Sequence, residues 1–220
     1  MTKRILVKKV SEPSSVEGIR SLLDEEKIPY ASIANANWKK DFPYEPEVSF
    51  RVAHTDKAIL LEYLVKEDDV RAVAGKDNGN VWEDSCVEFF IQPDGKDGIY
   101  YNFECNCAAN LLEGMGPGRS SRTLSSQENL NKVQRWSTYQ KDVLFQEKST
   151  DGKSWSAFLR IPYSAFFAHD IKDMGHKVVR GNFYKCGDKL PKPHYLSWSP
   201  IDLPAPNFHC PEFFGELEFE

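Results

Sequence analysis

The sequence predicts an all-β fold in which two antiparallel sheets pack face to face. Three observations lead to this fold class. Apolar and polar residues alternate with period two along several runs, which is the pattern of half-buried strands. Clusters of Gly, Pro, Asn and Asp separate these runs. Helical patterns are few, so we expect only one or two short helices beside the sheets.

The alternation predicts the strands one by one. It is clear in five runs, within residues 48–53, 59–65, 87–91, 101–106 and 155–161. Weaker runs that complete the predicted sheets lie at residues 178–186, 195–199 and 215–219.

Other segments predict helices, turns and loops. Residues 15–27 are expected to form a short helix, because a serine can cap its start and three aliphatic residues share one face. A further helical turn is expected at 164–169, and the turn residues at 150–153 predict a hairpin between two strands. Residues 110–131 and 200–211 are predicted as long loops, where binding sites of a rigid sandwich usually lie.

Composition bounds the classes of function. We expect one domain over residues 1–220, with residues 1–45 as an N-terminal extension that packs on the sandwich. The net charge of −5 disfavours a nucleic-acid partner, and no apolar run is long enough to indicate a membrane partner. The N-terminus lacks the long apolar centre of a signal peptide. The expected location is therefore cytoplasmic, or secreted if a leader has been removed.

Five cysteines, Cys86, Cys105, Cys107, Cys186 and Cys210, are an odd number, which argues against a fully paired disulfide framework. The Cys105-x-Cys107 spacing does not suit zinc. We expect buried, reduced thiols and assign no metal ligands.

Trp82 is the leading candidate for ligand contact. A polar turn at residues 77–80 delivers it just before a strand. An indole at such a junction can stack on the apolar face of a sugar, whose hydroxyls then need polar partners at the rim. The alternative is a tryptophan that packs in the core or at a sheet edge.

Polar residues on neighbouring strands could supply those partners. Asn102, Glu104 and Asn106 fall on one face of their strand, and Glu88 can join them from the strand before. Amides and carboxylates together offer donors and acceptors for vicinal hydroxyls. The alternative is a solvated outer face.

A proline-rich segment near the C-terminus presents a second aromatic. Phe208 lies between Asn207 and His209, and the prolines around it restrict the backbone. Trp198, inside a strand pattern, is expected in the core.

The segments Asn80-Val81-Trp82-Glu83, Val87-Glu88-Phe89-Phe90-Ile91, Ser197-Trp198-Ser199 and Phe214-Gly215-Glu216-Leu217 resemble the family 9 carbohydrate-binding modules. The resemblance covers roughly residues 46–219. It implies an immunoglobulin-like β-sandwich that holds a sugar, often at the reducing end of a glycan chain, between two aromatic rings. It also implies a place in the breakdown of polysaccharides such as xylan, beside a glycoside hydrolase, because these modules accompany xylanases and related glycosidases.

The resemblance assigns roles to individual residues. Trp82 matches the first stacking aromatic, Glu88 a hydrogen-bonding carboxylate and Asn106 a hydrogen-bonding amide. Phe208 stands where the family has a second tryptophan, and Glu104 where it has an arginine that contacts the sugar. The family also binds structural calcium, for which Asp77, Asp84 and Asp94 are the nearest acidic loop residues, although they form no dense ligand pattern.

The favoured function is non-catalytic sugar binding between Trp82 and Phe208, with Glu88, Glu104 and Asn106 as polar contacts and Asn207 and His209 beside them. We therefore assign no catalytic residues. The alternative is a glycoside hydrolase that uses paired carboxylates such as Glu88 and Glu104. A lesser alternative is a haem- or redox-binding sandwich. The chain has no nucleophile elbow, zinc-protease motif or phosphate loop.

Overall fold

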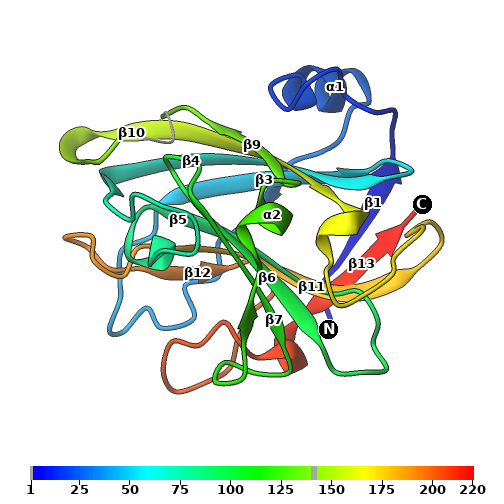
Figure 1. Cartoon of the computed structure of the whole chain (residues 1–220). Helices are drawn as coiled ribbons and strands as arrows, with labels where there is room; N and C mark the ends of the chain where they lie inside the picture. Colours follow the sequence, from blue (N-terminus) through cyan, green and yellow to red (C-terminus); the bar gives the residue numbers. More distant parts are fainter. Residues whose placement is uncertain (1, 140–142) are drawn as a thin grey trace.

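The computed structural model describes residues 2–139 and 143–220 (Figure 1). Its two α-helices are α1 (Ile19–Glu25) and α2 (Gln127–Leu130). The strands are β1 (Arg4–Lys9), β2 (Ala31–Ser32), β3 (Glu47–His54), β4 (Ala58–Ala72), β5 (Cys86–Gln92), β6 (Tyr100–Asn106), β7 (Leu111–Gly116), β8 (Thr123–Leu124), β9 (Gln134–Ser137), β10 (Phe145–Pro162), β11 (Val178–Cys186), β12 (Tyr195–Ser197) and β13 (Gly215–Phe219).

The strands form one curled sheet in the order β8-β7-β6-β5-β11-β13-β1-β3-β4-β10-β9, with β12 beside β11 and β2 beside β3. The sheet folds over so that its first half, from β8 to β13, packs on its second half, from β3 to β9 (Figure 1). Across this interface Phe50 of β3 stacks on Phe183 of β11, with centroids 3.8 Å apart. The predicted all-β sandwich is confirmed, and Trp198 lies in its core as expected.

The N-terminal strand departs from the expectation of a purely antiparallel fold. β1 pairs in parallel with β13 on one side and with β3 on the other, so it joins the two halves. Val7 in its centre is completely buried. The start of residues 1–45 is therefore built into the sheet, whereas we expected the whole segment to pack on it as an extension. Strand pairing between distant segments leaves no local signal in the sequence.

Three local predictions are also changed. α1 is shorter than the predicted helix. The segment at 110–131, expected to be a loop, contains β7, β8 and α2, whose first turn is capped by the Ser126 hydroxyl. Residues 150–153 form no hairpin: β10 continues through them, and its register against β4 shifts between Lys148 and Lys153. Turn-forming residues here produce a bulge, in which Gly152 takes a φ of +75°.

Period-two alternation gives the first half-sheet two different faces. One face carries Val87, Phe89, Phe103 and Phe183 into the main core between the half-sheets. The opposite face carries Phe90 and Tyr184 into a second apolar cluster, which the segment before β13 covers together with Trp38. The polar residues of β5 and β6 share this second face.

The cysteines behave as expected, since all five are free and buried. No helix in the described part of the chain is long and apolar enough to cross a membrane.

Candidate functional site

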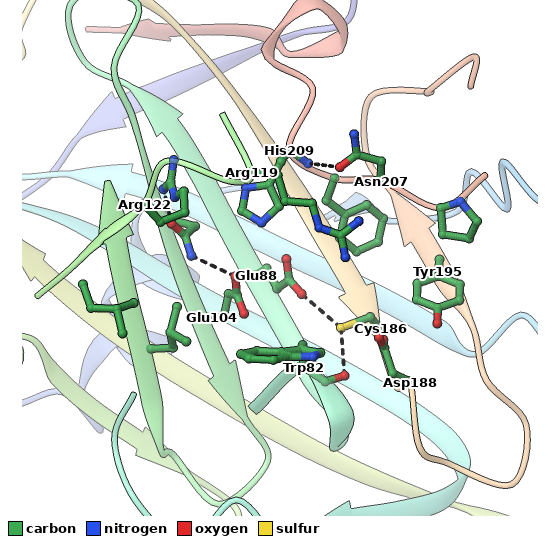
Figure 2. A pocket seen from close by; sticks show the side chains of 15 residues that line it. Trp82, Glu88, Glu104, Arg119, Arg122, Cys186, Asp188, Tyr195, Asn207 and His209 are labelled. Carbon is green, nitrogen blue, oxygen red and sulfur yellow. Dashed lines mark hydrogen bonds between the residues drawn. The ribbon is translucent and has the colours of Figure 1, made fainter. Parts of the chain in front are cut away.

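A cavity of about 400 Å³ opens on the second face of the first half-sheet (Figure 2). Six strands and four connecting segments supply its lining. It is lined by Trp82, Glu88, Asn102, Glu104, Leu112, Arg119, Arg122, Leu124, Cys186, Asp188, Tyr195, Pro206, Asn207, Phe208 and His209. Six of the seven predicted ligand contacts therefore meet in one place.

Two carboxylates stand side by side on the floor. Glu88 of β5 is directly opposite Glu104 of β6. The Cys107 N–H donates to the Ser85 carbonyl at 2.8 Å, which makes Ser85 and Cys107 a hydrogen-bonded pair of the β5–β6 ladder. Hydrogen-bonded and non-hydrogen-bonded pairs alternate along an antiparallel ladder, so Glu88 and Glu104 form a non-hydrogen-bonded pair. Side chains approach each other most closely across such non-hydrogen-bonded pairs. Both side chains are almost fully buried, with exposures of 3% and 5%.

Neutral groups hold both carboxyls. The Asn102 amide donates to Glu104 Oε1 at 2.8 Å, and the Cys186 thiol donates to Glu88 Oε1 at 3.0 Å. Burial raises the pKa of Glu104 to about 7. Burial, followed by the charge of Glu104, holds the pKa of Glu88 well above its usual range. Near neutral pH the floor can therefore offer carboxylic O–H donors as well as acceptors.

Trp82 forms one wall. It lies in a short 3-10 turn, Val81–Glu83, just before β5, and its side chain is only partly buried. Its carbonyl accepts the Asp188 N–H at 3.1 Å and the Cys186 thiol at 3.5 Å. The end of β11 thus fixes the backbone that carries the indole, and Figure 2 shows the ring at one end of the pocket with His209 at the other.

Phe208 lines the same cavity from the proline-rich segment. One face of its ring stacks on Tyr184, with centroids 4.1 Å apart and planes within 7°. Only 9% of the residue is exposed, so Phe208 is chiefly a packed residue with a small accessible area. Its ring does not contact that of Trp82.

His209 and Asn207 brace this wall. The Asn207 side-chain oxygen accepts a hydrogen bond from the backbone N–H of His209 at 3.0 Å. The imidazole Nδ1 of His209 bonds to the Tyr100 hydroxyl at 2.9 Å. Burial, followed by the nearby Arg122 and Arg119 charges, lowers the pKa of His209 to about 3. The imidazole is therefore neutral at physiological pH.

Asn106 does not line the cavity, and this corrects its predicted place among the ligand contacts. It is completely buried at the end of β6. Its amide donates to Asp84 at 3.0 Å, while its side-chain oxygen accepts the N–H groups of Ala108 and Asn110. Asn106 lies on the same face of β6 as Glu104, but its side chain stabilises the turn that follows the strand.

The acidic loop residues considered for calcium have protein partners. Asp84 pairs with Arg71 at 3.1 Å and accepts the N–H groups of Val73 and Ala74. Asp77 pairs with Arg135, and Asp94 lies in an exposed turn. A different donor set lies beside the floor: the Sγ atoms of Cys86 and Cys186 and an oxygen of Glu88 are within 4.8 Å of one another. Two thiols and a carboxylate are donors that suit zinc.

Sequence reasoning missed several lining residues. Arg119 and Arg122 come from the connection between β7 and β8, Asp188 comes from the connection between β11 and β12, and Tyr195 begins β12. The resemblance led us to expect one sugar-contacting arginine at the position of Glu104, whereas the cavity has two, both from the segment predicted as a loop. The Gly- and Arg-rich composition of that segment was the available signal.

Aromatic residues of the N-terminal segment support the site from behind. Trp38 Nε1 donates to the Leu203 carbonyl at 2.7 Å, and its ring contacts Tyr195 edge-on at 6.4 Å. Phe42 contacts Tyr195 at 4.8 Å in the same manner. These rings pack against the wall of the cavity and do not cover its mouth.

The chain is similar to known carbohydrate-binding proteins in sequence and in structure. Residues 17–219 match the model of carbohydrate-binding family 9. The whole chain aligns with the whole of a candidate carbohydrate-binding protein from Bacteroides uniformis, a crystal structure with 51% sequence identity and a TM-score of 0.95. A search of curated proteins finds no match.

Two more distant structures share the fold. They are a family 9 module from Caldicellulosiruptor kristjanssonii in complex with glucose (14% identity, TM-score 0.64) and one from the same organism with cellotriose (15% identity, TM-score 0.62). Each covers 99% of this chain, which covers 96% and 94% of them. The family match spans nearly the full length, and the chain therefore belongs to carbohydrate-binding family 9.

Proposed function

We propose that this protein binds a saccharide without transforming it and that the ligand occupies the cavity between Trp82 and Phe208. The observation that carries the proposal is a partly exposed indole beside a floor of buried hydrogen-bonding groups. A pyranose matches this arrangement, because its C–H face can lie on the indole while its hydroxyls reach polar partners. The family 9 complexes with glucose and cellotriose support the choice of ligand class.

Each lining group has a part in this model. Trp82 supplies the stacking face, and Glu88, Glu104 and Asn102 meet hydroxyls from the floor. Phe208 supplies a smaller second contact, because its ring is already packed against Tyr184. Asn207 and His209 hold the Phe208 segment and offer polar atoms at the rim.

Calorimetric titration of a panel of mono- and oligosaccharides into wild type and Trp82→Ala tests the proposal. We expect the variant to lose about 10- to 100-fold in affinity, since the stacked area and the aromatic contact together contribute roughly 1–3 kcal/mol. Its thermal unfolding should change little, because Trp82 is at the cavity wall. Trp136→Ala is the matched control: this indole stacks on Phe158, which belongs to the other half-sheet, at 5.2 Å. Equal affinities for wild type and Trp82→Ala would contradict the stacking model.

A glycoside hydrolase is the second candidate, because Glu88 and Glu104 share the cavity and both have raised pKa values. Hydrolysis needs two carboxyl groups that flank the scissile bond. Here the two rise side by side from adjacent strands, which favours binding. Chromatography of the same sugars after long incubation separates the functions. Products that form with wild type and not with Glu88→Gln would establish hydrolysis.

We also propose that binding serves glycan breakdown together with a glycoside hydrolase, on the strength of the family resemblance. Addition of the protein to a hydrolase that digests an insoluble glycan should raise the release of sugar, and Trp82→Ala should not. Equal release with both proteins would remove this role and leave the binding function intact.

A further inference from the structure

Two arginines reach the cavity from one short connection. Arg119 and Arg122 lie between β7 and β8, in a turn closed by Gly116, whose φ is +155°. A Cβ atom at Gly116 would lie 2.0 Å from the Ser121 carbonyl oxygen, so only glycine permits this closure. Both side chains line the pocket, and Figure 2 shows Arg122 at its edge near Glu104 and Arg119 extended toward its middle.

Arg122 is held in place by neutral groups. Its guanidinium donates to the carbonyls of Gly116 at 2.9 Å, Gly114 at 3.0 Å and Tyr100 at 3.2 Å and to the side chain of Asn102, and it lies 4.3 Å above the Tyr100 ring. Its Nε atom is buried and has no hydrogen-bond partner in the described part of the chain. These contacts orient the guanidinium without neutralising its charge.

Arg119 differs from Arg122 in being exposed. Figure 2 shows its side chain extended into the middle of the pocket, between His209 and Tyr195. Its charge influences Asp188 and Tyr195, yet it forms no ion pair with any residue that the structure describes.

The other arginines show that carboxylate partners are the rule in this protein. Six of them form ion pairs: Arg4, Arg20, Arg51, Arg71, Arg135 and Arg160. Arg180 donates to two backbone carbonyls on the surface. Only within the cavity do two arginines stand together without a carboxylate partner among the described residues, although Glu104 is close by.

The carboxyls on the floor do not cancel these charges below neutral pH. Burial favours the protonated form of Glu104, whose pKa is about 7, and of Glu88, whose pKa is held well above its usual range. His209 is neutral because its pKa is about 3. Burial raises the pKa of Asp188 to about 6, so at pH 6 it is only about half ionised. The cavity is therefore positive at that pH.

We propose that the sugar bound here carries an anionic group, a carboxylate, sulfate or phosphate, which Arg119 binds directly and the charge of Arg122 attracts while the sugar ring lies against Trp82. The guanidinium group suits such oxyanions, because its planar fork of N–H donors can bind two oxygens at once. Arg122 is the fixed member of the pair, and the exposed Arg119 can close over the ligand. This inference rests on the proposed sugar-binding function and names the class of sugar.

The test is calorimetry at pH 6 with matched pairs of neutral and acidic sugars: glucose with glucuronate, galactose with galacturonate, and mannose with mannuronate. For the pair that fits the site we expect the acid to bind about 10-fold or more tightly than the neutral sugar. Glucose 6-phosphate and glucose 6-sulfate, measured beside glucuronate, identify the anionic group. The preference should shrink as salt is added, because exposed charges are screened.

Arg119→Gln is the decisive variant, since an exposed side chain can be changed without disturbing the fold. It should abolish most of the preference for the acid, measured as the ratio of the affinities for the acid and its matched neutral sugar. Arg4→Gln is the matched control, because the Arg4 side chain is exposed and does not line the cavity, and it should keep the full preference. Neutral sugars that bind as tightly as their acids, or an unchanged preference in Arg119→Gln, would overturn this inference and leave the proposed function standing. Failure of every sugar, neutral or acidic, to bind would overturn the proposed function itself.

Discussion

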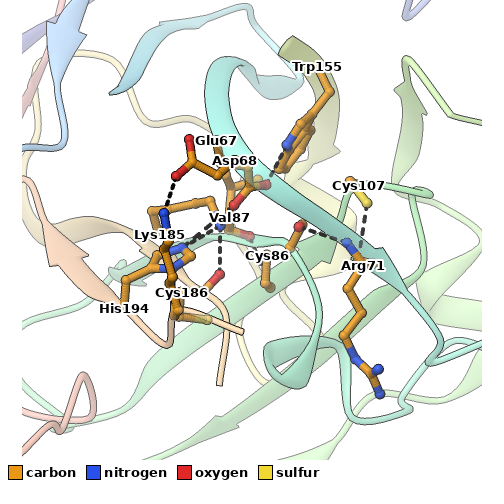
Figure 3. A network of polar contacts seen from close by, with 12 residues as sticks. Glu67, Asp68, Arg71, Cys86, Val87, Cys107, Trp155, Lys185, Cys186 and His194 are labelled. Atoms are coloured by element: carbon orange, nitrogen blue, oxygen red, sulfur yellow. Dashed lines mark hydrogen bonds and ion pairs between the residues drawn. The ribbon is translucent and has the colours of Figure 1, made fainter. Parts of the chain in front are cut away.

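Buried carboxylates occur on both faces of the first half-sheet, and the two groups are held in different ways. Between the half-sheets, Glu67 of β4 pairs with Lys185 of β11 at 2.9 Å and accepts a hydrogen bond from the Trp155 indole at 2.7 Å (Figure 3). On the opposite face, Glu88 and Glu104 have only an amide and a thiol as hydrogen-bond donors. The first group has a cation of its own, and the second has none within ion-pair distance among the described residues.

The inner network joins a lysine, a histidine and a carboxylate. Lys185 Nζ contacts Glu67, the Cys186 carbonyl and His194 Nε2, and His194 Nδ1 bonds to the Lys192 carbonyl. Burial and then the Lys185 charge hold the pKa of His194 well below its usual range, so its Nε2 accepts from the ammonium. The pairing of Glu67 of β4 with Lys185 of β11 ties the two half-sheets together. The difference teaches that the carboxyls of the cavity are left available for a ligand, while those of the interior are used by the fold.

The largest expected effect comes from breaking the inner pair. Lys185→Met leaves the Glu67 carboxylate buried without its cation, so we expect the free energy of unfolding to fall by about 3–5 kcal/mol in urea titrations. Sugar affinity of the folded variant should stay near that of wild type. The double variant with Glu67→Gln should recover part of the loss. A loss below about 1 kcal/mol would show that this network is no stronger than a surface pair.

The buried Glu88–Glu104 pair should make the free energy of unfolding depend on pH. The pKa of Glu104 is raised in the folded state, so its favourable contribution is full below the unfolded value near 4.5 and is lost as pH rises through about 7. Stability should therefore fall between pH 5 and pH 8, and Glu104→Gln should remove up to about 3 kcal/mol of that fall. Urea unfolding at both pH values measures it, with the exposed Glu216→Gln as control. The same pH dependence in wild type and Glu104→Gln would refute the raised pKa.

A smaller effect is expected from Asn106, which lies on the face of the cavity but is satisfied like the inner network. Asn106→Ala removes one of several partners of Asp84 and leaves the N–H groups of Ala108 and Asn110 without their acceptor, and should lower the free energy of unfolding by about 1–3 kcal/mol. Calorimetry of the folded variant should show wild-type sugar affinity. If affinity falls while stability is kept, Asn106 contacts the ligand after all.

The sequence predicted the sandwich and most of the cavity floor, because strand alternation is a local property. Period two alone places Asn102 and Glu104 on one face, and the pairing of β5 with β6 then adds Glu88. Trp82 and Phe208 were identifiable because polar or proline-rich segments present them. Alternation could not show that β6 ends at Asn106, where the side chain bonds to the backbone of the following turn.

The residues that sequence reasoning missed depend on contacts between distant segments. Arg119 and Arg122 reach the cavity only because β7 pairs with β6 and the following turn closes over it. Tyr195 depends on the pairing of β12 with β11 and on the rings of Trp38 and Phe42 behind it. No spacing along the chain encodes these approaches, just as none encodes the parallel pairing of β1.

The position of β1 has a consequence for how the protein folds. Within this sheet, the strand that is synthesised first pairs with the strand that is synthesised last, as Arg4 to Val7 lie beside Glu216 to Phe219. Until residue 219 has left the ribosome, β1 can find only its two-residue pairing with β3, and the curled sheet stays open. Contacts between such distant segments slow folding. Completion of the sandwich, and with it the final order of the binding face, is therefore expected to follow translation of the whole domain.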